Sequence, residues 1–199
     1  MKFIEQNLRI ASSLDIPDIV NIHQLAFPNF YLTNMGTGFL KAYYSSVLAY
    51  PNHIVLVVSM NNQVLGFVVG FKNPMLFYVF FKSRRFQYLW HIFLALVKKP
   101  SLILRTFTNT RRISDRYEAS DDIELSSIAV HPDARGIGSI LLKAFLRAAQ
   151  DQCATNVVLT TDAYDNETVN SFYERHRFKL VETYNDGNRM MNRYKLPLK

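Results

Sequence analysis

Residues 123–142 read I-E-L-S-S-I-A-V-H-P-D-A-R-G-I-G-S-I-L-L, and this stretch decides the fold class. Its first eight residues are apolar enough to predict a central strand of a sheet. Pro132 ends the strand, and Gly136 and Gly138 lead into a helix. Apolar residues at helical spacing predict the buried face of this helix: Ile137, Ile140, Leu141, Ala144, Phe145 and Ala148. A strand, a glycine loop and a helix in this order indicate an α/β protein.

The flanking segments supply further strands and helices. Strands are expected at residues 8–11, 53–60, 63–71, 156–161, 178–184 and 189–196. Helices are expected at residues 15–26, 38–49 and 166–176. Turns at Asn61-Asn62 and Asp186-Gly187 would join two pairs of these strands into hairpins. We therefore predict a mixed sheet flanked by helices, in one domain that spans residues 1–199.

The composition is that of an ordinary globular protein, with 49% hydrophobic and 20% charged residues. The single cysteine, Cys153, excludes an intramolecular disulfide, and nothing near it has the spacing of metal ligands. We expect Cys153 to be a small buried residue, and we expect no metal site. The first residues lack the apolar core of a signal peptide, so the expected location is the cytoplasm.

The glycine loop at residues 135–139 has the character of an anion-binding loop. Backbone N–H groups gather at the start of a helix, where the helix dipole also favours negative charge. Gly136 and Gly138 allow close approach of a phosphate, and Arg135 adds a positively charged guanidinium group. A P-loop would need Lys before Ser139, and a dinucleotide fingerprint would need Gly where Leu141 stands. Neither of these two motifs is present.

The loop and its flanks resemble the GNAT superfamily of acetyl-CoA-dependent N-acetyltransferases. That family's phrase L-S-S-I-A-V-x-P-x-x-R-G-x-G-I-G-x-x-L-L is matched by L-S-S-I-A-V at residues 125–130, by Pro132 and by R-G-I-G-S-I-L-L. Downstream, N-E-T-V-N-S-F-Y-E-R-H-R-F at residues 166–178 resembles the family's second signature, N-x-x-A-x-x-F-Y-x-x-x-G-F. The resemblance covers most of the chain, with residues 73–119 outside it. It implies a GNAT-like, mostly antiparallel central sheet and acetyl-CoA as cosubstrate.

The loop departs from the family pattern in two ways that depend on the register. If Gly136-Ile137-Gly138 is the family's Gly-x-Gly, the helical stripe is preserved, but the Arg/Gln position falls on Asp133 and the loop is two residues short. If Arg135 is the family's arginine, Ile140 stands where Gly or Ala is expected. We prefer the first register. An inward-facing Asp133 would repel a pyrophosphate.

The resemblance implies catalytic roles for two residues. Tyr173 would be the general acid that protonates the departing thiolate, although packing alone would also explain its place beside Phe172. Glu124 is the candidate base for the amine, and its alternative is an exposed charge at a strand start. Three further carboxylates could substitute for it: Glu118, Asp121 and Asp122.

The resemblance also implies which residues contact the cofactor. Main-chain groups of Ile128, Ala129 and Val130 would pair with pantetheine, which adds like an extra strand, and one N–H would stabilise the oxyanion. The pyrophosphate would lie at Arg135, Gly136, Ile137, Gly138 and Ser139. Asn166 would contact the cofactor at the next helix start, or would act only as an N-cap. Arg177 replaces the family's usual glycine, which predicts strain of about 1 kcal/mol or a different helix end.

Residues 73–119 form a basic, aromatic-rich segment that we expect to be a helical insertion before the central strand. Ten Lys and Arg residues lie between Lys72 and Arg116, against one acid, Asp115, so the net charge of +7 belongs to this segment. Residues 86–97 carry no Asp, Glu, Lys or Arg but are too short to span a bilayer. Three interpretations of residues 77–112 stay open: a cover over the acceptor cleft that favours anionic acceptors, a peripheral membrane contact, or a homodimer surface. Nucleic acid is not expected, because aliphatic residues interrupt the aromatic ones.

The sequence thus predicts an N-acetyltransferase that moves an acetyl group from acetyl-CoA to a primary amine of a small-molecule acceptor by direct attack. The alternative is a GNAT-fold protein with altered catalysis that binds acyl-CoA or a membrane surface. The sequence does not identify the acceptor.

Overall fold

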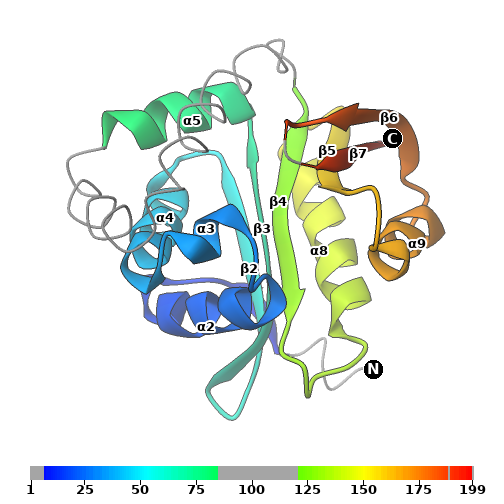
Figure 1. The fold of residues 1–199 in the computed structure, drawn as a ribbon. Coiled ribbons are helices and arrows are strands. Elements are labelled where there is room, and N and C mark those ends of the chain that lie inside the picture. The colour runs from blue at the N-terminus through cyan, green and yellow to red at the C-terminus, as the bar shows by residue number, and fades with distance from the viewer. Residues whose placement is uncertain (1–6, 85–120, 188, 199) are drawn as a thin grey trace.

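A seven-stranded mixed sheet with helices on both faces forms the described part of the protein (Figure 1). The computed structural model describes residues 7–84, 121–187 and 189–198. The strands are β1 (Leu8–Ile10), β2 (His53–Met60), β3 (Gln63–Lys72), β4 (Ile123–Val130), β5 (Asn156–Asp162), β6 (Lys179–Asn185) and β7 (Met190–Pro197). Their order across the sheet is β1-β2-β3-β4-β5-β7-β6. Only the β4–β5 pair in this sheet is parallel, so the predicted mixed and mostly antiparallel sheet is confirmed.

The helices fall into two groups along the chain. The 3-10 helix η1 (Ser13–Asp15) leads into α2 (Ile16–Ala26), and α3 (Tyr31–Asn34), α4 (Thr37–Ala49) and α5 (Pro74–Ser83) follow. The second group is α8 (Ile137–Asp151) and α9 (Glu167–Arg175). The four helices α2 to α5 lie on one side of the central strands and α8 lies on the other (Figure 1).

Local sequence signals explain where several elements begin and turn. Ser12 and Asp15 form a capping box at η1, and Arg9 holds the Asp15 carboxylate through contacts of 2.6 and 2.7 Å. Asn61 and Asn62 both have positive φ, which suits the tight turn of the β2–β3 hairpin. These elements follow the sequence expectation to within a few residues.

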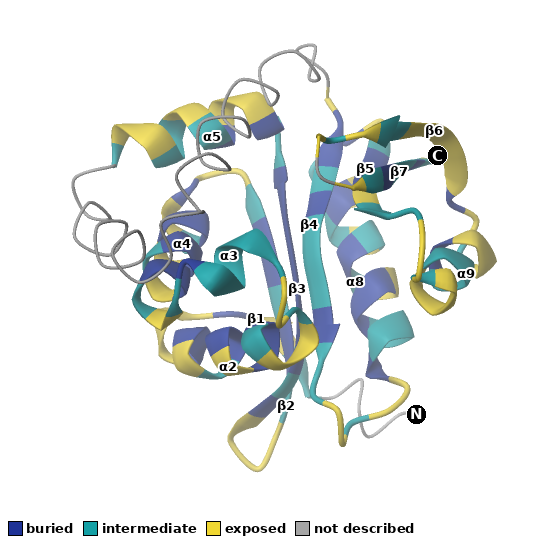
Figure 2. Cartoon of the chain, in the orientation of Figure 1, coloured by how far each residue is buried: buried dark blue, intermediate teal, exposed yellow. Residues whose placement is uncertain are grey.

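Each face of the sheet has its own hydrophobic core (Figure 2). The first core joins α2, α4 and α5 to β2 and β3, and Phe77 of α5 is fully buried in it. The second core joins α8 and α9 to β4, β5 and β7. Phe71 and Phe77 stack with ring centroids 3.9 Å apart, so α5 is fixed to the sheet. Helix α5, at the start of the expected insertion, is therefore part of the first core. Residues 85–120 of the insertion lie outside the described residues.

Helix α8 approaches the sheet closely because of one glycine. A Cβ on Gly70 would lie 2.3 Å from the carbonyl oxygen of Glu124 and 2.4 Å from the Phe145 ring. Phe145 is fully buried, as are Ile137 and Leu141 of the predicted stripe. The other residues of the stripe are half-buried: Ile140, Ala144 and Ala148. Leu142 and Ala149, which are not part of the predicted stripe, are buried. The buried face is thus rotated slightly from the predicted one.

Strand β4 contains a bulge at its centre. Val69 of β3 pairs with Ser127 and Gly70 pairs with Leu125, so Ser126 is an extra residue. Both serines consequently face α4, where Ser126 contacts the Tyr43 hydroxyl at 3.2 Å and Ser127 hydrogen bonds to Tyr44. A regular strand would have sent them to opposite faces.

The expectation for Cys153 was wrong. It is exposed, and its φ of 54° places it in the left-handed region just after α8. The chain turns there to enter β5, so the position is set by the end of the helix rather than by the core.

Among the helices that the structure describes, none has the length and apolar character needed to cross a bilayer.

Arg177 has a φ of 68°, a conformation that favours glycine. It follows α9, and its N–H donates to the Glu174 carbonyl at 2.9 Å. We expect Arg177→Gly to raise the free energy of unfolding by about 1 kcal/mol, because the strain disappears while the backbone is kept. Denaturant unfolding measures this, and Arg175→Gly, at the last residue of α9, should instead lose up to about 0.5 kcal/mol. Equal losses in both variants would contradict the assigned strain.

Candidate active site

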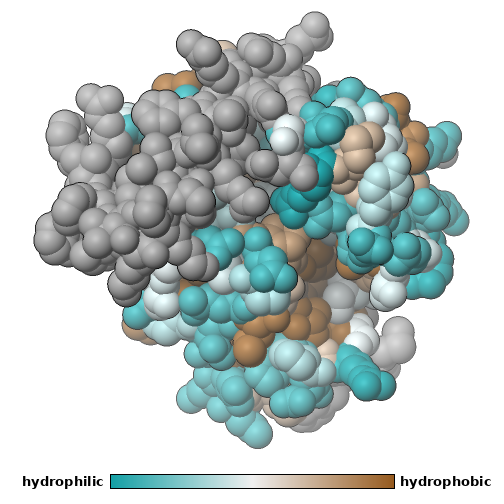
Figure 3. Space-filling view, in the orientation of Figure 1, coloured by the Kyte–Doolittle hydropathy of each residue, from teal (hydrophilic) through white to brown (hydrophobic). Residues whose placement is uncertain are grey.

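A large cavity lies where β4 and β5 separate. The two strands pair only at Ile123–Val157 and Glu124–Val158. Beyond these positions a cavity of about 1180 Å³ opens, with walls from α2 to α5, β4, β5, α9, β6 and β7. Hydrophobic surface lines the hollow between the two sides of the molecule (Figure 3).

The edge of β4 that faces this cavity carries backbone groups that β3 does not use. The His131 N–H donates to the Leu65 carbonyl at 2.8 Å, so these two residues form a hydrogen-bonded pair. Such pairs alternate along an antiparallel ladder. Ile128 and Val130, opposite Val68 and Gly66, therefore direct their N–H and C=O groups away from β3. This edge can pair with an extended ligand chain.

The start of α8 lies at the end of the same strand. Gly136 is the N-cap with a φ of 82°, and a Cβ there would meet no atom within 4 Å. The N–H groups of Ile137, Gly138 and Ser139 have no hydrogen-bond partner in the described part of the chain. The helix begins at Ile137, directly after Gly136. The loop can therefore offer backbone donors to an anion.

The two charged residues of this loop differ in their surroundings. The Asp133 side chain is 91% exposed, and its carboxylate lies 3.6 Å from Nδ1 of His131. Arg135 is also exposed, next to the N-cap glycine. Asp133 is thus held beside His131 at the far end of the loop from the helix start.

Tyr173 combines burial with a place in the cavity wall. Its side chain is 5% exposed and packs against the rings of Phe172, Phe178 and Tyr194. Burial raises the pKa of the Tyr173 phenol above its ordinary value of 10. The phenol therefore keeps its proton at neutral pH and can act as a donor, although it is a weaker acid than an exposed tyrosine.

Glu124 is the carboxylate at the point where β4 and β5 part. It pairs with Phe71 and Val158 across the sheet and lines the cavity. Its charge helps to raise the pKa of Tyr43, after the larger effect of burial. Glu124 is half-buried, so the interpretation as an exposed strand-start charge is wrong.

The substitute carboxylates that the structure describes have structural partners. Asp121 forms an ion pair with Lys72 at 3.0 Å. Asp122 is buried and accepts hydrogen bonds from Thr155 and Asn156. Glu118 lies outside the described residues.

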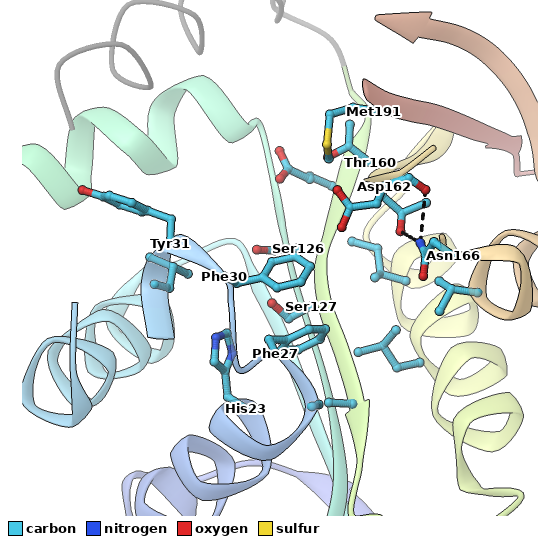
Figure 4. Close-up of a pocket in the computed structure, with 18 of the residues that line it drawn as sticks. His23, Phe27, Phe30, Tyr31, Ser126, Ser127, Thr160, Asp162, Asn166 and Met191 are labelled. Atoms are coloured by element: carbon cyan, nitrogen blue, oxygen red, sulfur yellow. Dashed lines mark hydrogen bonds between the residues drawn. The ribbon is translucent and has the colours of Figure 1, made fainter. Parts of the chain in front are cut away.

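Asn166 caps α9 by position but not through its side chain. Its amide donates to the Thr161 hydroxyl at 2.7 Å and to the Asp162 carbonyl at 3.2 Å (Figure 4). The side chain thus fixes the end of β5 against the start of α9 at the cavity wall.

Arg189 joins the two sides of the cavity. Its guanidinium lies 3.0 Å from the Asp162 carboxylate and 4.6 Å from the centroid of the Phe30 ring. Phe30 belongs to the segment between α2 and α3, whereas Asp162 ends β5. A cation–π contact and an ion pair therefore tie the N-terminal side to the C-terminal side.

His23 is a cavity residue that sequence reasoning left in the core. It sits at helical spacing on the apolar face of α2, so no local signal distinguished it. Nδ1 of His23 lies 2.6 Å from the Tyr44 hydroxyl, and Nε2 is buried and has no hydrogen-bond partner within the described ranges of the chain. His23 lies below Ser127 and beside Phe27 (Figure 4).

The structure brings together most of the predicted site residues. Those that line the cavity are Glu124, Ile128, Ala129, Val130, Gly138, Asn166 and Tyr173. Arg135, Gly136, Ile137 and Ser139 lie on the adjoining loop and the first turn of α8. Within the described residues, no cluster of His, Cys, Asp or Glu side chains has the arrangement of a metal site.

Residues 16–178 match the family model described as Acetyltransferase (GNAT) family. The chain belongs to the GNAT acetyltransferase family. It is therefore an acyltransferase, as its two signatures predicted. No curated protein matches the chain in sequence.

Solved structures share the fold at low sequence identity. Ribosomal-protein-alanine N-acetyltransferase from Brucella melitensis has a TM-score of 0.64 at 16% identity, covering 96% of this chain and 99% of that chain. Ard1 from Thermoplasma volcanium has a TM-score of 0.62 at 18% identity, covering 96% and 97%. Aminoglycoside 6'-acetyltransferase type Ii has a TM-score of 0.62 at 13% identity, covering 96% of each chain. At these identities the likeness shows the GNAT fold alone.

The buried His23 should make stability depend on pH. Burial lowers the pKa of His23 from 6.5 to about 4. Between pH 6.5 and pH 4 the unfolded chain therefore binds a proton that the folded protein does not bind. The contribution of the neutral His23 ring to the free energy of unfolding is complete above pH 6.5. It is lost as pH falls toward 4, by up to about 3 kcal/mol. Denaturant unfolding at pH 7 and pH 4.5 measures this loss. The difference between wild type and His23→Phe isolates it, and parallel pH curves for the two would refute a buried neutral imidazole.

Proposed function

We propose that this acetyltransferase moves an acetyl group from acetyl-CoA to a primary amine of a small-molecule acceptor by direct attack. The observation that carries the proposal is the split between β4 and β5. An unpaired strand edge, a cavity and a glycine-capped helix start meet there, with a buried tyrosine in the wall.

The residues of the split fit the parts of acetyl-CoA. Ile128 and Val130 would hydrogen bond to the amide groups of pantetheine, as a strand does in a sheet. The N–H groups of Ile137, Gly138 and Ser139, with Arg135, would hold the pyrophosphate. Asn166 already orders the wall opposite β4, and its side chain can contact the pantetheine arm.

The chemistry needs a proton acceptor, an oxyanion donor and a proton donor. Bound acetyl-CoA supplies a thioester carbonyl that an amine can attack. Glu124, directly or through ordered water, would accept the proton that the amine loses. The outward N–H of Ile128 would donate to the carbonyl oxygen as its charge grows, which leaves the Ile128 C=O and both backbone groups of Val130 for pantetheine.

Tyr173 would protonate the departing thiolate. Its raised pKa makes this step more uphill than it is for an exposed phenol, because a thiol has a pKa of about 8.5. Positioning offsets part of that cost, since the ring is fixed by three aromatic neighbours. The phenolate that remains can be reprotonated from the proton taken up by Glu124.

Tyr173→Phe should lower kcat by about 100-fold while leaving the Kd for acetyl-CoA nearly unchanged, because only the hydroxyl is removed. Free CoA release and calorimetry measure the two quantities. Tyr194→Phe is the matched control, since Tyr194 packs 6.2 Å from Tyr173 in the same core but is not part of the cavity wall. An unaltered rate in Tyr173→Phe would remove the residue from this role.

Two substitutions on one loop test the cofactor site. Arg135→Ala should weaken acetyl-CoA binding by about 5- to 10-fold, as expected for one exposed charge-assisted contact. Asp133→Ala should leave the Kd unchanged or lower it, because this exposed carboxylate only repels phosphate. Calorimetry with acetyl-CoA compares the three proteins. If wild type gives no heat and no thermal shift at millimolar acetyl-CoA, the enzyme proposal fails and a GNAT-fold protein with altered catalysis is left.

A further inference from the structure

The N-terminal side of the cavity is an aromatic chamber. Aromatic side chains from the segment after α2 and from α3, α4 and α5 form its wall: Phe27, Phe30, Tyr31, Phe39, Tyr43, Tyr78 and Phe81. Leu32 and Met35 complete this wall, and Met35 and Phe39 form a small core of their own. A ligand that fills this chamber would gain free energy by burying apolar surface and by ring-to-ring contacts.

One polar atom in this chamber wall, Nε2 of His23, has no hydrogen-bond partner among the residues that the structure describes. His23 is 3% exposed, and its Nε2 is buried without a hydrogen bond. Leaving a buried polar atom unpaired costs about 1–3 kcal/mol. A ligand group that paired with this atom would recover that cost.

The neighbours of His23 determine what Nε2 can recognise. Tyr44 hydrogen bonds to Ser127 on the β4 bulge and to Nδ1 of His23 at 2.6 Å. Burial raises the pKa of Tyr44 and hydrogen bonding from Ser127 opposes that rise, which fits Ser127 as the donor to the Tyr44 oxygen. We assign the tautomer in which the Tyr44 hydroxyl donates to Nδ1 and the ring proton is on Nε2, which is then a donor. Burial also lowers the pKa of His23 to about 4, so the ring is neutral at pH 7 and is too weak a base to take the proton from the amine.

We propose that the aromatic chamber binds the acceptor as an arylalkyl primary amine, and that Nε2–H of His23 donates to an oxygen carried by its aromatic group. This specifies the substrate class of the proposed acetyl transfer and rests on it. His23 would be a specificity-determining residue rather than a proton carrier.

Tyramine and phenethylamine test this directly, because they differ by one hydroxyl. Calorimetry on the CoA-loaded protein should give tyramine at least about 10-fold tighter binding, and kcat/KM should favour tyramine by a similar factor. In His23→Phe the two amines should bind within about twofold of each other. The Tm of His23→Phe should change little, because the apolar ring removes an unpaired polar atom but also removes a partner of the buried Tyr44 hydroxyl. The Kd for acetyl-CoA should not change.

Companion variants separate recognition from structure. His23→Gln keeps an N–H donor and should restore part of the preference for tyramine. Tyr44→Phe frees Nδ1 and should lower the preference without abolishing it, since the ring loses its fixed tautomer. A fall in Tm with an unchanged amine ratio in His23→Phe would show a purely structural role and overturn the proposal.

The proposal and the general function fail in different ways. If wild type binds acetyl-CoA but neither arylalkylamine, and acetylates amino sugars, polyamines or a peptide N-terminus instead, the chamber assignment is wrong and acetyl transfer stands. Equal binding of the two amines by wild type overturns the role of His23 without any variant. If acetyl-CoA itself does not bind, the general function is refuted.

Discussion

Strand β4 loses its partner after Glu124, and the site depends on this loss. A strand in the middle of a sheet normally satisfies its backbone on both edges, since unpaired N–H and C=O groups are costly when they are buried. Here β3 continues along one edge while β5 turns away along the other. The bulge at Ser126 changes the phase of β4 at the same place and sends two serine hydroxyls toward α4. The opening, its unpaired edge and its polar wall therefore have one origin.

Packing separates the two sides of the opening, whereas the contacts of Arg189 connect them. Two separate cores build the sides, and Gly70 lets Phe145 of α8 press onto the sheet under the opening. Arg189 crosses between the sides through its contacts with Asp162 and Phe30. Burial raises the pKa of Asp162, while the positive charge of Arg189 opposes that rise. The separation of β4 and β5 is thus maintained by side-chain packing on both sides of the opening.

Local patterns predicted most of the elements, because their causes are local. The strand 123–130 was predicted with its observed limits, and Asn61-Asn62 predicted its hairpin turn. The bulge could not be predicted, since two serines in an apolar run fit a regular strand equally well. Cys153 was misplaced because composition favours burial, whereas the end of α8 sets its backbone.

The sequence predicted residues that the fold brings to one cavity, but it did not predict the acceptor side of that cavity. Tyr173 and the glycine loop carry motif signals, and Glu124 is the carboxylate on the predicted central strand. The fold brings them to one cavity and its adjoining loop. His23 has no such signal: its spacing on α2 is that of a core residue, and only the tertiary structure leaves its Nε2 unpaired. The aromatic chamber likewise forms from segments that are far apart in sequence. Each segment by itself predicts only ordinary core residues.

The order β5-β7-β6 has a consequence for how the protein matures on the ribosome. Strand β7, at residues 190–197, must enter between two strands that were synthesised before it. Until it emerges, β5 lacks its long antiparallel partner, and Met191 and Arg193 are missing from the cavity wall. A nascent chain can therefore fold its N-terminal core early, yet it carries an incomplete cavity wall and an open strand edge until β7 has emerged.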